Sequence, residues 1–561
     1  MTDLISRIRR IDLKKINIET IKRDRRKLLY YLSAALLAAV VIIILIIMHK
    51  RMPYMLDSNM SSELLLSKRL SEEQSVLSKS WYYSTEIRVL NTQLIYSFFF
   101  NFTDNWHTVR MLSSAVMLVM LCACTVFLCR KAGCPKYGFL TAVCMMTALS
   151  ATYYRFVIVG CYYIPHIVIS FLTLAFVFMY LKPDSRRKRF LLASAVLSLI
   201  AGMGGMRQLV VTYIPLALAV ILIAAVMIYQ KGLPGFRGSD HYHAVIISLA
   251  DLAAGVTGYL INSRVLAKIY KFKAWDDIKF TKFDFDRLRT VFCDFFTLLG
   301  YTTGKITLKT IFCNCAFFAI FGITVWAVIA GLRKKAGREL RLITVFFLCG
   351  MSVFTAIYTL TDMKYMVRYM VPVVVFVFPM AAMALHEADS GKLPRNARQA
   401  AMILLIAAVL GRGAVAYNGM RHQDQTKGIR EIAAYLKASE YRNGYSTFWN
   451  GNVITELSNG EVTLYTWFGS SGDTDGSSLE KTTELDDLFE WLQYTDHMDS
   501  PPQGKVFVVY KNNEIEYAKW KDALRDSDII FTAADYTVYG YDSYDDVKAL
   551  YDKYCLSDDT E

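Results

Sequence analysis

The stretch "LLYYLSAALLAAVVIIILIIMHKRMPYMLDSNMSSELLLSKRL", residues 28–70, decides the class of this protein. Its first part, residues 28–49, is almost entirely apolar. A helix of that length crosses the ~30 Å hydrocarbon layer of a bilayer. Two carboxylates, Asp57 and Glu63, follow shortly after this predicted span. The sequence therefore raises two questions first: which side of the membrane these carboxylates face, and which residues gather beside them.

Apolar runs of similar length recur along the 561 residues. The chain is 54% hydrophobic, with a mean hydropathy of +0.30. Because a spanning segment must satisfy its backbone polar groups internally, we predict that these runs are helices. The fold class is a polytopic α-helical membrane protein with about eleven spans. The predicted spans are residues 28–49, 110–129, 137–153, 163–181, 190–205, 208–229, 243–262, 308–332, 340–360, 369–386 and 399–417.

Basic residues at the span ends predict the orientation. The N-terminus, residues 1–27, is strongly basic, which places it in the cytoplasm. Every second loop is then cytoplasmic as well, and these loops are "CRKAGCPK", "LKPDSRRKRF", "KGLPGFRG", "GLRKKAGRELR" and "HEADSGKLPRNAR". All but the last are clearly basic. The first span has no small-residue cleavage site, so we interpret it as a retained anchor and not as a signal peptide.

Charge divides the chain into two parts. Residues 418–561 contain 13 basic and 27 acidic side chains, a net charge of −14. Because the whole chain has a formal net charge of +14, residues 1–417 carry a net charge of +28. Cytoplasmic loops and lipid head groups account for the basic part, and nothing in it predicts a nucleic-acid partner. We therefore predict a transmembrane domain at 28–417, with a long first outer loop at 50–109. An acidic extracytoplasmic domain follows at 418–561.

The acidic region alternates helical and extended patterns, which predicts a small α/β domain. Expected helices are "GIREIAAYLKASE" and "LEKTTELDDLFEWLQ", and expected strands are "YSTFW", "KVFVVY" and "DIIFTA". The loop "SSGDTDGSS" contains Asp473 and Asp475, which either bind a cation or simply lie in a solvated loop.

Motifs of several common enzyme classes are absent from the sequence. There is no Walker motif, no Rossmann glycine fingerprint and no H-E-x-x-H, so nothing predicts ATP, a nicotinamide or a metalloprotease. Most of the eleven cysteines lie in or beside spans, where free cysteine acts as a small apolar residue. The acidic domain contains only Cys555, so no disulfide framework is expected there.

The first outer loop contains the candidate catalytic carboxylates. Its apolar residues recur at helical spacing, which predicts helices at the membrane interface, with an aromatic belt formed by Trp81, Tyr82, Tyr83 and Trp106. Asp57 is a candidate base, and it is equally suited to cap a helix that begins at "SNMSSE". Glu63 is its candidate partner, and Glu86 is the reserve carboxylate.

Cationic and aromatic residues recur at the other outer loops. "ATYYRFVIVGCYYIPHIV" contains Arg155, Tyr163 and His166; "AGMGGMRQLVV" contains Arg207; and "TDMKYMVRYMVP" contains Arg368. Each arginine could simply snorkel to the head groups. Several cations on one face, opposite a carboxylate, instead favour a shared anionic ligand, and the simplest is a lipid phosphate.

This order of parts resembles the GT-C superfamily of integral-membrane glycosyltransferases. The stretches that carry the resemblance are "DSNMSSELLLSKRL", "SWYYSTEIRVLNTQLIYSFFF", "YYIPHI", "RYMVP" and "STFWNGNVITELSNG", and they are similar to uncharacterised bacterial proteins of this type. Two motifs of the group are missing. The adjacent acidic pair of protein mannosyltransferases is absent, and so is the Trp-Trp-Asp sequence of oligosaccharyltransferases, so transfer to asparagine is not expected.

The resemblance implies a sugar transfer from a polyprenyl-phosphate donor to an acceptor of the cell envelope, outside the membrane. In that group the first-loop acid serves the acceptor, which assigns Asp57 as base. Arg207 and Arg368 would hold the donor phosphate, assisted by Arg155 or His166. Glu63 would either orient the acceptor or hold a divalent cation, with Glu86 and Tyr163 as secondary residues. A single displacement would invert the anomeric centre.

Two other functions remain open. A transporter or flippase would need ionisable groups deep inside the spans, and Asp251 is such a group, although no internal repeat accompanies it. A non-catalytic surface receptor would leave the first-loop acids and the arginines without a role.

Overall fold

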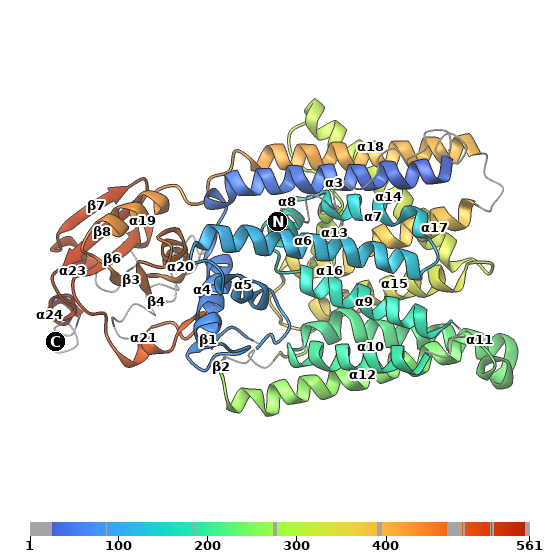
Figure 1. Cartoon of the computed structure of the whole chain (residues 1–561), viewed down its shortest axis with the longest axis horizontal. Coiled ribbons are helices and arrows are strands. Elements are labelled where there is room, and N and C mark those ends of the chain that lie inside the picture. Colours follow the sequence, from blue (N-terminus) through green and yellow to red (C-terminus); the bar gives the residue numbers. More distant parts are fainter. Residues whose placement is uncertain are drawn as a thin grey trace, which may run out of the picture.

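The computed structural model describes residues 25–85, 87–182, 187–272, 278–389, 395–467, 485, 488–515, 518 and 521–555. Figure 1 shows a bundle of long helices and, at one end of it, a smaller region that contains most of the strands. We call that end of the bundle the domain end. The two parts are in contact through α4, a helix of the first loop, which packs against α20 of the smaller region.

The bundle consists of helices that match the apolar runs. Its long helices are α3 Arg25–Arg51, α6 Trp106–Lys131, α9 Ile164–Tyr180, α10 Arg187–Met203, α11 Ile214–Arg237, α12 Asp240–Arg264, α14 Leu308–Leu332, α15 Arg338–Leu360, α17 Val377–Asp389 and α18 Arg395–Met420. Shorter helical pieces complete it: η2 Met52–Tyr54, η3 Pro135–Tyr137, α7 Gly138–Met146, α8 Ala151–Tyr153, η4 Tyr154–Val159, η5 Leu209–Tyr213, η6 Leu266–Lys268, η7 Val367–Met370 and α16 Val371–Val374.

Eight helices among the described residues are long and apolar enough to cross a membrane. The count rises to nine if the pair Pro135–Met146 and Ala151–Val159, bent by 96°, is one span. Ten of the eleven predicted spans coincide with helical segments of the bundle, whereas the span predicted at 137–153 is divided between η3, α7 and α8. This agreement confirms the polytopic helical class. The total of eleven stays a prediction, because α9 and α10 are shorter than a typical span.

Helices α10 and α12 pack more closely than any other pair of helices in the bundle. A Cβ at Gly202 would lie 2.0 Å from the Gly255 carbonyl oxygen, and one at Gly258 would lie 2.1 Å from the Leu199 carbonyl oxygen, so only glycine fits. The deep acid Asp251 belongs to this contact, where its Oδ2 accepts a hydrogen bond from Ser194 at 2.8 Å. Asp251 thus joins two helices.

Three segments that are distant in sequence meet in a small sheet at the domain end. The strands β1 Trp81–Tyr83, β2 Lys271–Phe272 and β5 Gln493–Tyr494 pair in the order β2-β1-β5. The first loop also contains the helices α4 Ser58–Glu72 and α5 Gln93–Phe100, and α13 Phe285–Leu298 precedes α14. This sheet therefore connects the first loop, the segment after α12 and the smaller region into one surface.

The smaller region is a mixed five-stranded sheet in the order β4-β3-β6-β8-β7. Its elements are α19 Ile429–Ala438, β3 Asn443–Thr447, α20 Phe448–Leu457, β4 Thr463–Trp467, α21 Asp496–Asp499, β6 Val506–Lys511, α22 Asn512–Ile515, α23 Lys521–Arg525, β7 Ile529–Ala533, β8 Tyr536–Tyr541 and α24 Tyr544–Cys555. Strand β3 is parallel to β4 and β6, whereas β8 is antiparallel to β6 and β7.

Strand β6 is apolar because both of its faces are covered. Phe507 and Val509 belong to the core that continues through α19 and α20 into the bundle. Val506, Val508 and Tyr510 point into a second core on the opposite face. The apolar run "KVFVVY" is therefore a central strand, as the sequence predicts.

Two predicted elements of this region are wrong in part. The strand expected at "YSTFW" ends at Thr447, because Phe448 begins α20. The helix expected at "LEKTTELDDLFEWLQ" is not present in its described part, where Leu488 to Leu492 are irregular and Gln493 pairs in β5. Its remaining residues, and the loop with Asp473 and Asp475, lie outside the described residues.

The predicted aromatic belt of the first loop is also wrong. Trp81, Tyr82 and Tyr83 form β1, between β2 and β5, and their side chains are buried. Trp106 is buried too, and a Cβ on Gly460 would lie 2.7 Å from its ring. These aromatic residues bind protein segments to each other instead of facing lipid head groups. Burial of the Tyr83 phenol also raises its pKa.

Candidate functional site

Asp57 lies at the N-terminus of α4, at the domain end of the bundle. Its Oδ1 accepts a hydrogen bond from the Met60 backbone N–H at 2.9 Å, so it caps the helix as the sequence suggests. Such a cap is worth about 1 kcal/mol. Capping occupies only one of the two carboxylate oxygens, and the side chain retains 12% of its exposure. The cap therefore leaves room for a second role.

Two residues after α8 complete the surroundings of Asp57. Arg155 donates to Asp57 Oδ2 from Nη2 at 2.6 Å and from Nε at 3.2 Å. Tyr162 donates to Oδ1 from its hydroxyl at 3.3 Å. Both guanidinium nitrogens reach the same oxygen, Oδ2, and this charge-assisted contact fixes the orientation of the carboxylate. Of the four donors around Asp57, the Tyr162 hydroxyl makes the longest contact.

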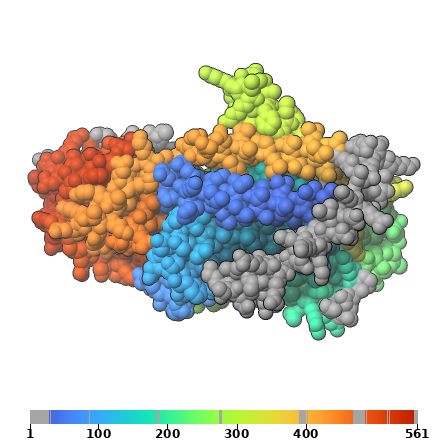
Figure 2. Space-filling model, turned by 45° about the horizontal axis from the view of Figure 1, so that its top comes forward, coloured from blue at the N-terminus to red at the C-terminus, as the bar shows by residue number. Residues whose placement is uncertain are grey.

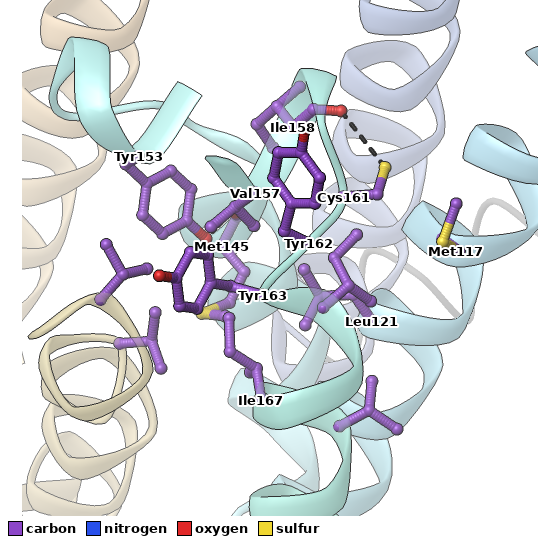
Figure 3. Close-up of a cluster of buried hydrophobic side chains, with 14 of the residues drawn as sticks. Met117, Leu121, Met145, Tyr153, Val157, Ile158, Cys161, Tyr162, Tyr163 and Ile167 are labelled. Carbon is purple, nitrogen blue, oxygen red and sulfur yellow. Dashed lines mark hydrogen bonds between the residues drawn. The ribbon is translucent and has the colours of Figure 1, made fainter. Parts of the chain in front are cut away.

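The turn between η4 and α9 brings these residues to Asp57. Cys161 has φ 57°, and its thiol contacts the Ile158 carbonyl oxygen at 3.6 Å. Figure 3 shows this contact, with Tyr162 and Tyr163 following on the same turn. The rings of Tyr153, Tyr162 and Tyr163 gather in a buried cluster with methionine and aliphatic side chains. A rigid apolar cluster thus supports the polar group.

Glu63 lies one and a half turns into α4. Its Oε2 accepts a hydrogen bond from the Thr92 hydroxyl at 2.8 Å, and its Oε1 lies 3.9 Å from Nη1 of Arg88. Its side chain retains 17% of its exposure. Among the described residues no group of three or more His, Cys, Asp and Glu side chains could hold a metal ion. The surroundings of Glu63, a hydroxyl and a guanidinium, suit hydrogen bonding to a polar ligand.

Cations and aromatic rings alternate from Arg155 into the bundle. The Arg155 guanidinium lies 5.9 Å from the Phe156 ring centroid, and Arg368 lies 5.2 Å from the same ring. Arg368 also lies 5.6 Å from the Tyr369 ring, which is 5.1 Å from Arg207. Such contacts with aromatic rings hold guanidinium groups in place. The result is a row of three arginines that begins at Asp57.

The row ends at a large cavity. This cavity has a volume of about 510 Å³ and lies between η5, α12, α15 and β2. Arg207 and Tyr369 form part of its wall, and most of the remaining lining is apolar, for example Val210, Phe354 and Ile357. An apolar cavity with a guanidinium in its wall matches an amphiphile with an anionic head group.

Two predicted site residues, His166 and Tyr163, occupy other positions. His166 is buried and its Nδ1 is 3.1 Å from Oε1 of Gln208, in a small cavity that Arg88 also lines. Tyr163 is buried beneath Arg207, whose guanidinium lies 5.6 Å from its ring. Glu86 lies outside the described residues. Tyr163 therefore packs on Arg207 of the arginine row, and His166 lies in the neighbouring small cavity.

A buried ion pair that local sequence patterns do not predict lies next to the site. Arg110 of α6 contacts Glu456 of α20 through Nε at 2.5 Å and Nη2 at 2.6 Å, and it also donates to the Met60 carbonyl oxygen at 3.0 Å. Asn452 of α20 donates to the Ser62 hydroxyl at 2.7 Å. The only sequence signal was a charged residue, Arg110, inside a predicted span. The smaller region thus holds α4, and with it Asp57, in place.

Solved structures share this fold. ArnT from Cupriavidus metallidurans, solved bound to undecaprenyl phosphate, matches 90% of this chain and 97% of its own, with a TM-score of 0.54 and 13% identity. An oligosaccharyltransferase from Archaeoglobus fulgidus, tethered with an acceptor peptide, matches 87% of this chain and 70% of its own, with a TM-score of 0.50 and 10% identity. Both are GT-C superfamily membrane glycosyltransferases.

The fold expected from the resemblance is therefore confirmed: this chain has a GT-C fold. No family model matches the sequence, and no curated protein sequence matches it. At identities of 10–13% the likeness is one of fold, so the chemistry has to be argued from the residues of this chain.

Proposed function

We propose that this protein is a membrane glycosyltransferase that moves a sugar from a polyprenyl-phosphate donor to an acceptor hydroxyl. One observation carries the proposal: the row Asp57, Arg155, Arg368 and Arg207 connects a carboxylate to an apolar cavity of about 510 Å³. A base for the acceptor and cations for a lipid phosphate are the two groups that such a transfer needs.

The donor occupies the cavity with its prenyl chain. Its phosphate lies at Arg207, which forms part of the wall, and Arg368 is next in the row. Guanidinium groups bind phosphate oxygens through paired N–H donors, which a lysine cannot reproduce. The sugar then points along the row toward Asp57. ArnT, which shares the fold, was solved with undecaprenyl phosphate, a lipid of this chemical class.

The reaction is a single displacement. The acceptor oxygen bonds to the anomeric carbon while the bond from that carbon to the phosphate oxygen breaks. The acceptor proton passes to Asp57, and polyprenyl phosphate leaves with the electron pair of the broken bond. The arginines stabilise the negative charge that develops on the leaving phosphate. Attack from the side opposite the phosphate inverts the anomeric centre.

Asp57 needs one free lone pair to act as base. The four hydrogen bonds that it accepts fill the four acceptor positions of a carboxylate. The acceptor hydroxyl replaces the Tyr162 hydroxyl, because that contact, at 3.3 Å, is the longest of the four. Arg155 stays in place and holds Oδ2 of the carboxylate while the proton transfers. Glu63 of α4 and Thr92, the residue before α5, position the acceptor.

The remaining features of the proposal concern location. The basic loops and the N-terminus face the cytoplasm, and the smaller region faces the outside, where an envelope acceptor is available. The transporter alternative rests on Asp251, but this carboxylate bonds Ser194 in the tight α10–α12 contact and lies away from the cavity lining. A helix-joining role accounts for it.

The test is reconstitution in liposomes with labelled polyprenyl-phosphate sugars and an envelope extract as the source of acceptor. The native protein should move label from the lipid to a product that no longer contains the prenyl chain, and the Asp57→Asn variant should not. Label that crosses the bilayer still attached to its lipid would establish the transporter instead.

A further inference from the structure

A second groove on the surface of the bundle has no role in the proposed transfer. It lies between α3 and α18, the first and last long helices, which Figures 1 and 2 show side by side. These helices have the smallest buried share of any candidate span among the described residues, 22% each, so they face lipid. The groove has a volume of about 640 Å³ and is open to the surroundings.

The lining of this groove changes character along its length. Ile46, Ile47 and Ala414 form the part that lies toward the middle of the helices. Basic side chains and a histidine form the part at the domain end, where Lys50 and Arg51 come from α3, and Arg421 and His422 follow α18. An apolar slot with a cationic end is complementary to a lipid with an anionic head group.

No ion pair joins Lys50, Arg51 or Arg421 to a carboxylate within the described part of the chain, although the charge of Asp424 also acts on Arg51. Asp424 is the nearby carboxylate, and Arg430 engages it at 2.6 and 2.8 Å. Arg51 donates to the Gln423 backbone oxygen at 2.7 Å and packs on the Tyr54 ring at 4.2 Å. That contact fixes the Arg51 guanidinium at the end of the groove. Arg51 is held in place beside two exposed cations, Lys50 and Arg421. Such a cluster differs from a single arginine whose side chain snorkels to the head groups.

We infer that this groove binds one anionic phospholipid, with its acyl chains between α3 and α18 and its phosphate at Lys50, Arg51, Arg421 and His422. A phospholipid is favoured over the polyprenyl-phosphate donor for a structural reason. The groove lies open on the lipid-facing surface, whereas the donor cavity lies among η5, α12, α15 and β2 on other helices. The inference does not depend on the proposed transfer.

A bound phospholipid at this position would also stabilise the site. Tyr417 lines the groove, and its ring packs edge-on against Tyr154 with centroids 4.9 Å apart. Tyr154, with Arg155 and Gln423, lines a separate cavity of about 280 Å³. The lipid therefore braces the helices that support the arginine paired with Asp57.

The experiment counts lipids retained by the purified protein. Native mass spectrometry is carried out after exchange into detergent with phosphatidylglycerol, phosphatidylcholine or decaprenyl phosphate. The native protein should retain one phosphatidylglycerol, and should retain phosphatidylcholine at least tenfold less. Lys50→Ala with Arg421→Ala should lower phosphatidylglycerol retention about tenfold or more. The cation-to-alanine changes lie on exposed side chains, so the fold should persist, and circular dichroism checks this.

Matched control changes are Lys282→Ala with Arg289→Ala, two exposed cations in the segment 278–298, which does not line the groove. They should leave phosphatidylglycerol retention unchanged. Equal losses in both double variants would show general attraction to head groups and overturn the inference. Equal retention of phosphatidylcholine would also overturn the inference. So would a loss of phosphatidylglycerol when an equal concentration of decaprenyl phosphate is added, if this loss occurs in the native protein and not in the Lys50→Ala, Arg421→Ala variant.

Discussion

Arg110 and Glu456 are 346 residues apart and form a buried ion pair between α6 and α20, with Nε and Oε1 separated by 2.5 Å. Their side chains are 1% and 5% exposed. The same guanidinium donates to the carbonyl oxygen of Met60, whose N–H is capped by Asp57. The pair therefore connects three parts of the chain: the bundle, the smaller region and the helix that carries the candidate base.

Glu456→Gln should destabilise the contact between α20 and α4, because it leaves the buried Arg110 charge without its partner. Breaking a buried pair costs on the order of 3–5 kcal/mol. Chemical unfolding and hydrogen exchange of α4 measure the effect. The matched control is Glu461→Gln, whose partner Lys437 is about half exposed, and its cost should be under about 1 kcal/mol. Equal stability of the two variants would show that the buried pair contributes nothing.

Asp57→Asn separates the cap from the base, since asparagine caps helices about as well as aspartate but does not accept a proton at neutral pH. We expect normal folding and a turnover lowered by a factor on the order of 10²–10⁴. Tyr162→Phe serves as comparison and should retain turnover, because the acceptor hydroxyl takes the place of the tyrosine. A well-folded Asp57→Asn protein with full transfer activity would move the role of base to Glu63 or Glu86.

Arg207→Ala and Arg368→Ala should each weaken donor use by on the order of 2–4 kcal/mol, through the loss of a charge-assisted contact to phosphate. Lysine should restore part of the activity at either position, since it keeps the charge but lacks the planar fork. The measurement is the rate of sugar transfer at limiting donor concentration. Arg264→Ala, an exposed cation at the end of α12, is the control and should behave as native. If both test variants transferred sugar at the native rate, these arginines would act only as membrane anchors.

The stability of the smaller region should depend on His497. Burial lowers the pKa of this imidazole to about 4 from 6.5, and its ring stacks on Tyr465 with centroids 4.2 Å apart. Because the folded pKa is depressed, the unfolded chain binds more protons between pH 6.5 and 4, so stability is full above pH 6.5 and falls toward pH 4.

The loss amounts to about 3 kcal/mol when the shift is converted at 1.36 kcal/mol per unit. Thermal unfolding followed by tryptophan fluorescence measures it. His497→Gln removes the titrating group, so its melting temperature should vary less over this pH range than that of the native protein. Parallel pH profiles for the two proteins would contradict the assignment.

The predicted orientation is tested by cysteine labelling in intact cells. Cys293 and Cys315 are exposed, so both are first replaced by serine, as is Cys555 of the acidic domain. A cysteine at Glu72, on α4, should react with an impermeant maleimide, and one at Lys334, after α14, should react only after lysis; both positions are exposed. The reverse pattern would place the site in the cytoplasm.

The sequence by itself determined the membrane class, the positions of the bundle helices and the cap at Asp57. These features depend on local pattern: an apolar run forms a helix in a bilayer whatever its neighbours are, and a carboxylate three residues before a free N–H caps a helix. Candidate residues Asp57, Arg155, Arg207 and Arg368 were found in the same way, because charge beside a span is conspicuous in an apolar chain.

Only the tertiary structure decided which of these residues meet. Three features of the site depend on how separate helices pack. They are the pairing of Arg155 with Asp57, the stacking of Arg207 on Tyr369 and the burial of His166. The burial of Trp81 in β1 depends on strands that lie about 190 and 410 residues later in the chain. Local periodicity contains no record of such partners, because contacts between distant segments are fixed by the packing of the whole chain.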